Sequence, residues 1–215
     1  MSARILLADD HAVVRSGLRL LLDAEPDLAV VGEAGDGAAA LELAAELRPD
    51  LAILDVSMPG QSGLAVAAQL AEAHPDMRVL LLSMYAHPSF LYAALQAGAS
   101  GYVLKSSADR DLVEACRAAL RDEPFLYPEG LEALMREVLA DPERVEEPLD
   151  LVLTPREREI VGLIATAHST NQIALELEIS PRTVERHREN ILAKLHMRDR
   201  VELTRYAIRW GLVDP

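Results

Sequence analysis

Short runs of continuously apolar residues alternate with longer segments in which apolar residues recur every three or four positions throughout the first part of the chain. A continuous apolar run is typical of a strand buried on both faces, and the longer pattern is typical of a helix that packs on a sheet. Their alternation predicts an α/β fold: a flavodoxin-like, doubly wound, five-stranded parallel sheet with helices on both faces. The predicted strands are residues 4–9, 28–34, 51–55, 78–83 and 101–105, and the predicted helices are residues 12–24, 36–47, 63–74, 87–98 and 108–121.

The rest of the chain lacks this alternation, so the first domain is expected to end at residue 121, as a unit of residues 1–121. Residues 122–150 contain four prolines and many acidic residues around one short apolar segment, which predicts a linker with one short helix. Residues 151–215 have no strand pattern and predict a second, all-α domain of four helices. These helices are expected over residues 155–167, 171–178, 181–196 and 199–212.

Charge is distributed unevenly along the chain. Residues 149–215 hold ten basic and ten acidic residues, whereas residues 1–148 hold 11 basic and 25 acidic residues and so carry the whole net charge of −14. Such an asymmetry indicates two parts with different roles.

Cysteine content and the lengths of the apolar runs indicate the compartment in which the protein is expected. The single cysteine, Cys116, excludes an intrachain disulfide bond, no apolar run reaches membrane-spanning length, and the first residues lack the pattern of a secretory signal. We therefore expect a soluble cytoplasmic protein with no membrane partner.

Charged and hydroxyl side chains lie at the ends of the predicted strands. Asp9 and Asp10 end the first strand, Asp55 the third, Ser83 the fourth and Lys105 the fifth. The carboxyl ends of parallel strands share one edge of the sheet, so these groups are expected to lie together. Three clustered carboxylates repel one another, and a hard divalent cation such as Mg²⁺ (or Mn²⁺) would relieve that repulsion.

This combination suits phosphoryl chemistry. The cation and Lys105 together would neutralise an incoming phosphoryl group, and a carboxylate can act as nucleophile and form an acyl phosphate. From its position alone, Asp55 is equally compatible with capping the next helix or facing solvent.

Residues 1–121 resemble a response-regulator receiver domain. The resemblance rests on the blocks "ADDHAVVRSGL", "LDVSMPGQSG", "LLLSMY" and "AGASGYVLK", which occur in the family's order. It implies that Asp55 is the phosphoacceptor. It also implies that Asp10, Asp55 and the backbone carbonyl of Ser57 bind Mg²⁺, with Asp9 adjacent.

The same resemblance assigns three residues to the response to phosphorylation. It implies that Ser83 hydrogen-bonds the phosphoryl group, that Lys105 pairs with it, and that Tyr102 changes rotamer as Ser83 is drawn in.

The stretch "NQIALELEISPRTVERHRENILAKL" predicts two helices joined by a tight turn, with Ser180 as N-cap and Pro181 in the first helical position of the second helix. That helix buries one side and presents polar residues on the other, which suits the DNA major groove. An ordinary solvated face fits these residues equally well. The candidate DNA-binding residues are Arg182, Thr183, Arg186, His187, Asn190 and Lys194.

Residues 151–213 resemble a LuxR-type helix-turn-helix domain through "LTPREREIV", "IALELEISPRTVERHRENILAKL" and "RVELTRYAIRWGLV". With the receiver, the chain resembles the NarL/FixJ family of response regulators. Two departures stand out. Ala167 occupies a turn position where the family usually has glycine, and Glu185 replaces a common lysine, so that it either reads a cytosine or points away from DNA.

The last predicted helix has apolar residues on two faces, and a single core needs only one. Leu203, Ala207 and Trp210 form the second face and are candidates for a homodimer interface on DNA. The alternative is that both faces pack internally.

The resemblance implies a two-component transcriptional regulator that a cognate sensor histidine kinase phosphorylates and that binds double-stranded DNA. The receiver is expected to inhibit the DNA-binding domain until Asp55 is phosphorylated. Apart from assisting its own phosphorylation and dephosphorylation, the protein is not expected to be an enzyme. Two alternatives stay open: a metal-dependent phosphatase, although Ser57 stands where a general-acid aspartate would be expected, and an adaptor whose helix-turn-helix binds protein.

Overall fold

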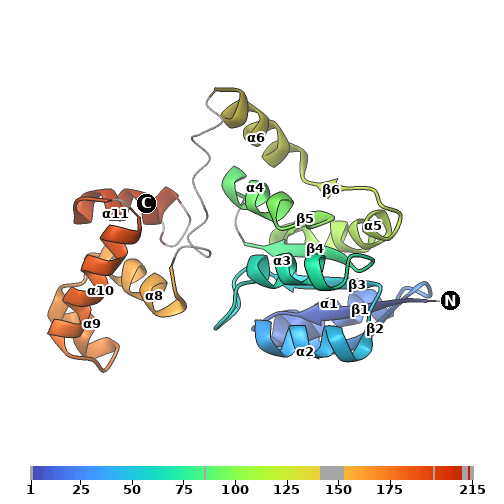
Figure 1. The fold of residues 1–215 in the computed structure, drawn as a ribbon, viewed down its shortest axis with the longest axis horizontal. Helices are drawn as coiled ribbons and strands as arrows, with labels where there is room; N and C mark the ends of the chain where they lie inside the picture. Colours follow the sequence, from blue (N-terminus) through green and yellow to red (C-terminus); the bar gives the residue numbers. More distant parts are fainter. Residues whose placement is uncertain (1, 85, 141–152, 196, 210–212, 214–215) are drawn as a thin grey trace. The chain divides into compact units, whose positions relative to one another are not determined.

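The computed structural model describes residues 2–84, 86–140, 153–195, 197–209 and 213 (Figure 1). The chain forms two compact units, Met1–Glu147 and Pro148–Pro215. The limits of the predicted linker fall partly outside the described residues and stay a prediction.

The first unit is built on a parallel sheet with the strand order β2-β1-β3-β4-β5-β6. The predicted parallel α/β fold is thus confirmed, and β3 and β4 occupy the centre of the sheet. Every residue of β3 is buried, as its continuous apolar run predicts. The strands are β1 (Ala3–Ala8), β2 (Leu28–Ala34), β3 (Leu51–Asp55), β4 (Arg78–Ser83), β5 (Gly101–Leu104) and β6 (Phe125–Leu126).

The sixth strand differs from the expectation of five. It lies in the predicted linker and pairs in parallel with β5, where Gly101 faces Phe125 and Tyr102 faces Leu126. This pairing covers the backbone of β5, which would otherwise be an exposed sheet edge. A strand of two residues has too few positions to show any periodicity, so the sequence pattern does not reveal it.

Helices cover both faces of the sheet (Figure 1). Helices α1 and α5 pack together on one face, where Leu18, Leu22, Leu112 and Cys116 join the strand residues in one core. On the other face, α3 packs between α2 and α4, and α4 also contacts α6. The helices are α1 (Ala12–Asp23), α2 (Gly37–Leu47), α3 (Gly63–Ala73), α4 (Pro88–Gln96), α5 (Ala108–Leu120) and α6 (Pro128–Ala140).

The second unit is helical throughout its described residues, as predicted. Helices α8 (Pro155–Ala165), α9 (Thr170–Glu176) and α10 (Pro181–Lys194) each begin after a hydroxyl residue whose side chain accepts a backbone N–H of the first turn. Helix α11 (Arg200–Arg209) packs on α8. None of the helices in the described parts of the chain is long and apolar enough to span a membrane.

Ala167 ends the turn after α8 with a φ of 67°, which is the left-handed conformation. A residue with a Cβ is strained there by about 1–2 kcal/mol, and glycine is not. Glycine in turn loses more backbone entropy on folding, by roughly 0.5–1 kcal/mol.

We therefore expect Ala167→Gly to raise the free energy of unfolding of the second unit by about 0.5–1 kcal/mol. Native-state amide exchange in α9 and α10 of the full chain measures this. Ala165→Gly is the matched control, because Ala165 is the last residue of α8 and its change to glycine is expected to lower the free energy of unfolding by up to about 1 kcal/mol. A loss of stability in both variants would contradict the assignment of strain to Ala167.

Candidate functional site

The carboxyl ends of the central strands bring two carboxylates and one ammonium group together. Asp9 follows β1 and Asp55 ends the neighbouring strand β3, while Lys105 follows β5 and reaches across the end of β4. The Lys105 Nζ atom lies 2.8 Å from Asp9 Oδ2 and 2.8 Å from Asp55 Oδ2. Asp9 is fully buried and Asp55 is 2 % exposed. The structure thus assembles these three groups where the sequence predicts them.

The two buried carboxylates are only partly compensated. Lys105 is at ion-pair distance, yet neither Asp9 Oδ2 nor Asp55 Oδ2 has a hydrogen bond of normal geometry. Burial raises the pKa of Asp55 to about 6, and the charge of Asp9 adds to this, although Lys105 and the Ser57 backbone N–H oppose it. Burial also opposes the charge on Lys105, but the two carboxylates outweigh it and raise the pKa of that ammonium group.

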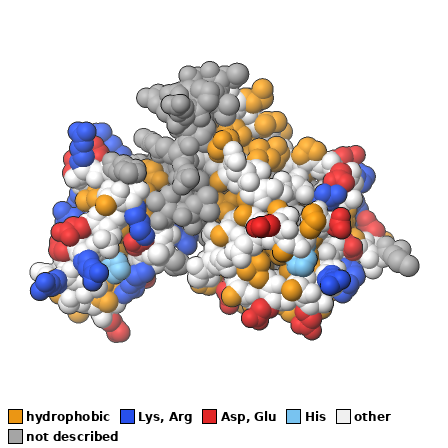
Figure 2. All heavy atoms as spheres, in the orientation of Figure 1, with side chains coloured by type: hydrophobic (Ala, Val, Ile, Leu, Met, Phe, Trp, Pro, Cys, Tyr) orange, Lys and Arg blue, Asp and Glu red, His pale blue; other side chains and the backbone are white. Residues whose placement is uncertain are grey.

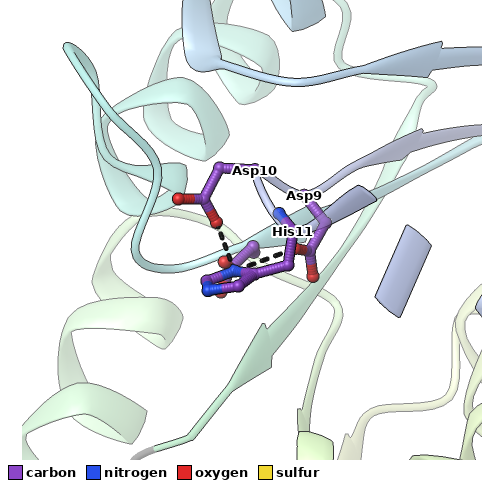
Figure 3. Close-up of side chains that lie close together, drawn as sticks. Asp9, Asp10 and His11 are labelled. Atoms are coloured by element: carbon purple, nitrogen blue, oxygen red, sulfur yellow. Dashed lines mark hydrogen bonds and ion pairs between the residues drawn. The ribbon is translucent and has the colours of Figure 1, made fainter. Parts of the chain in front are cut away.

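Asp10 and His11 line the open side of this cluster (Figure 3). His11 Nδ1 lies 2.6 Å from Asp10 Oδ1, and the His11 backbone N–H donates to Asp9 Oδ1 at 2.8 Å. Ligand atoms of Asp9, Asp10, His11 and Asp55 all lie within 4.8 Å of one another. Three carboxylates stand here against one ammonium group, and their oxygens are the ligand type that a hard divalent cation prefers.

Ser57 follows Asp55 by two residues, and Ser83 lies at the end of the strand beside it. The backbone N–H of Ser57 donates to Asp55 Oδ1 at 3.3 Å. Ser83 ends β4, beside β3, and is 1 % exposed. Tyr102 lies in β5 and is fully buried. Its ring contacts Tyr127, which sequence reasoning missed because Tyr127 stands in the predicted linker.

Helix α10 of the second unit has the two-sided character that its sequence predicts. Val184 and Ile191 are buried. Figure 2 shows Lys and Arg side chains over the visible face of this unit. Of the candidate DNA-binding residues, those that are exposed are Arg182, Arg186, Asn190 and Lys194, and those of intermediate exposure are Thr183 and His187.

Lys194 also has a structural partner that the sequence does not suggest. Its Nζ lies 2.6 Å from Oε2 of Glu157, a 5 % exposed carboxylate that also caps α8 through Thr154. Burial raises the pKa of Glu157, but Lys194 and Thr154 outweigh it, so the pKa is lowered overall. Lys194 therefore ties the end of α10 to the start of α8.

The structure shows where Glu185 points. Thr170 at the start of α9 donates to Glu185 Oε1 at 2.6 Å, and Arg188 lies 3.5 Å from its other oxygen. Glu185 thus connects α10 to α9, the two helices of the helix-turn-helix. Its carboxylate is engaged within the domain.

The predicted dimer face is corrected. Leu203 and Ala207 are fully buried on α11, which packs on α8, so they belong to the core of the second unit. Trp210 lies outside the described residues. Val201 is 57 % exposed and marks the opposite, outward side of the helix.

Family models match both units. Residues 5–117 match the response regulator receiver domain, and residues 151–207 match the bacterial regulatory proteins of the luxR family. The chain belongs to the response regulators that join a receiver to a LuxR-type DNA-binding domain, and it is a transcription regulator of the two-component type. This is a family of DNA-binding regulators rather than of enzymes.

Named relatives cover the whole chain. The oxygen regulatory protein NreC of Staphylococcus carnosus is 37 % identical over 216 residues, which cover 98 % of this chain and 99 % of NreC. The response regulator protein VraR of Staphylococcus aureus is 35 % identical over the full length of both chains.

Solved structures of response regulators are also similar to this chain over nearly its full length. The response regulator ChrA of a heme-sensing two-component system is 34 % identical, with a TM-score of 0.54 over 99 % of both chains. RcsB in a complex with DNA is 27 % identical, with a TM-score of 0.59 over 97 % of this chain and 99 % of RcsB.

The raised pKa of Asp55 has a consequence for stability. Its pKa is about 6 in the folded chain against an ordinary 3.8, so its contribution to stability is fully present below pH 3.8 and is lost as the pH rises through 6. Without metal, we expect Asp55→Asn to raise the free energy of unfolding at about pH 7.5 by up to about 3 kcal/mol.

Urea unfolding of the first unit at several pH values measures this difference, which should shrink between pH 6 and pH 3.8. Asp76→Asn makes the same change at an exposed position and is expected to stay within about 0.5 kcal/mol of the parent chain. Destabilisation by Asp55→Asn at neutral pH would contradict the assignment.

Proposed function

We propose that Asp55 accepts a phosphoryl group from a cognate sensor histidine kinase. The observation that carries this is the Lys105 ammonium group 2.8 Å from both Asp9 and Asp55 at the strand ends. In the reaction, an Asp55 oxygen attacks the phosphorus of the donor's phosphohistidine, the P–N bond breaks, and an acyl phosphate forms. With a pKa of about 6, Asp55 is ionised and able to attack at neutral pH.

Asp10, Asp55 and the backbone carbonyl of Ser57 would hold Mg²⁺ (or Mn²⁺), with Asp9 adjacent. The clustering of three carboxylates around one ammonium group supports this assignment, because the excess negative charge and the oxygen ligands suit such a cation. When bound, the cation offsets the repulsion between the carboxylates and the charge on the phosphoryl oxygens.

Three residues respond to the new phosphoryl group. Lys105 pairs with its oxygens, the Ser83 hydroxyl donates a hydrogen bond to it, and Tyr102 follows Ser83. The burial of Ser83 and Tyr102 beside the site supports these roles, because a shift of either residue disturbs packed neighbours. The same groups assist hydrolysis of the acyl phosphate, so the chain contributes to its own dephosphorylation.

The second unit binds double-stranded DNA through the exposed face of α10. The side chains that reach the major groove are those of Arg182, Thr183, Arg186, His187 and Asn190. Lys194 adds positive charge near the DNA backbone, besides its ion pair with Glu157. The protein binds as a homodimer. On α11, Val201 rather than Leu203 or Ala207 is an apolar side chain open to a second copy.

The receiver inhibits the second unit in the cytoplasm until Asp55 is phosphorylated. Residues 1–148 carry the entire net charge of −14, and this acidic body disfavours a nearby polyanion. Phosphorylation adds further negative charge, so activation requires a conformational shift rather than a change in bulk charge.

The first test compares phosphorylation and DNA binding in one experiment. With acetyl phosphate and Mg²⁺, the parent chain is expected to gain one phosphoryl group in an intact-mass spectrum and to bind its DNA site more tightly. Asp55→Asn keeps the shape of the side chain and removes the nucleophile, so it is expected to show neither change. Normal phosphorylation of Asp55→Asn would refute the site assignment.

A second test concerns the recognition helix. If Arg186 reads a guanine, Arg186→Ala is expected to weaken binding to the specific site by about 1–3 kcal/mol and to change non-specific binding little. Arg205→Ala removes the same charge from the exposed side of α11 and serves as the control. Equal, small losses in the two variants, measured at one salt concentration, would show that α10 is not the reading helix.

A further inference from the structure

Tyr127 connects the site of the switch residues to the start of α6. Its ring lies against Tyr102, with 5.8 Å between the ring centroids and 37° between their planes. Its hydroxyl donates a hydrogen bond of 2.6 Å to the carbonyl of Ala86, in the connection between β4 and α4. One side chain therefore touches both the predicted switch aromatic and the segment that follows Ser83.

The same tyrosine is packed into the first turn of α6. A Cβ atom added to Gly130 would lie 2.0 Å from Tyr127 Cζ, so the ring rests directly on the backbone of this helix. Leu134, one turn further along, is 5 % exposed, and α6 packs against α4 (Figure 1). Tyr127 thus fixes how α6 lies against the receiver.

Strand pairing places Ser83, Tyr102 and the residue before Tyr127 on three adjacent strands. Tyr102 faces Leu126 of β6, the residue before Tyr127, and Ser83 faces Leu104 of β5. Tyr102 is fully buried, and protein interiors are close-packed, so its ring changes rotamer only if neighbouring side chains also move. The Tyr127 ring is one of those neighbours.

We propose that Tyr127 is a positioning residue that couples the phosphorylation site to α6. In the unphosphorylated chain, its hydrogen bond to Ala86 and its contact with Tyr102 hold α6 on α4. Movement of Ser83 and Tyr102 after phosphorylation breaks the bond to Ala86 and loosens α6, from which the chain runs on through residues 141–152 to the DNA-binding unit. This inference rests on the proposed phosphorylation of Asp55.

The test is amide hydrogen exchange of residues 128–140 in the full-length chain, with and without acetyl phosphate and Mg²⁺. Tyr127→Phe removes only the hydroxyl and is expected to speed exchange in α6 about threefold to tenfold in the unphosphorylated chain, which is the effect of losing one hydrogen bond. Phosphorylation of the parent chain is expected to speed the same amides.

The decisive comparison is between the two states. If phosphorylation already breaks the bond, Tyr127→Phe and the parent chain exchange α6 at the same rate once phosphorylated, so the two effects are not additive. A purely structural bond would give the same increment in both states, and that result would overturn the proposal. Tyr92→Phe on α4 removes a hydroxyl that bonds Gln96 and is expected to change α6 exchange in neither state.

Gly130→Ala provides a second route to the same outcome. Its added methyl group displaces the Tyr127 ring, so fast α6 exchange without phosphate is expected here too. The intact mass of the parent chain distinguishes a failure of the proposed function from a failure of the role of Tyr127. If the parent chain gains no phosphoryl group, the proposed function is refuted. A normal gain with α6 exchange unchanged by phosphorylation would refute only the role of Tyr127.

Discussion

The ammonium group of Lys105 between Asp9 and Asp55 is the contact on which the rest of the receiver depends. Two carboxylates at adjacent strand ends are both nearly inaccessible to water, and one positive charge compensates them. The compensation is incomplete, because the pKa of Asp55 still rises to about 6. The remaining negative charge favours an additional cation, and Asp55 is still ionised at neutral pH, as the proposed nucleophile has to be.

Neighbouring strands of the sheet connect this charged site to Tyr127 and α6. Because β4 lies between β3 and β5, the proposed change at Asp55 would reach Ser83 on the neighbouring strand and then Tyr102 on the next. The added strand β6 extends the series by one position and brings Tyr127 and α6 into contact with it. A packed interior resists continuous deformation, so such a chain of contacts favours two discrete arrangements over a graded response.

Local patterns predicted most of the fold and the acidic site, because continuous apolar strands and their polar ends are readable over a few residues. Pairings between distant residues were not predictable in this way. Glu157 and Lys194 are 37 positions apart, and nothing near either residue identifies the other. Both sides of α11 carry apolar residues, so only its packing on α8 reveals that Leu203 and Ala207 face inward. The two residues of β6 owe their strand conformation to the open edge of β5.

Control of DNA binding by the receiver is most directly tested by comparing three species at matched salt and protein concentration: the unphosphorylated chain, the phosphorylated chain, and a fragment of residues 149–215. The fragment lacks the acidic unit and is expected to bind target DNA more tightly than the unphosphorylated chain. Phosphorylation of the full chain is expected to close most of that gap. A fragment that binds no better than the unphosphorylated chain would contradict inhibition by the receiver and leave dimerisation as the only route to activation.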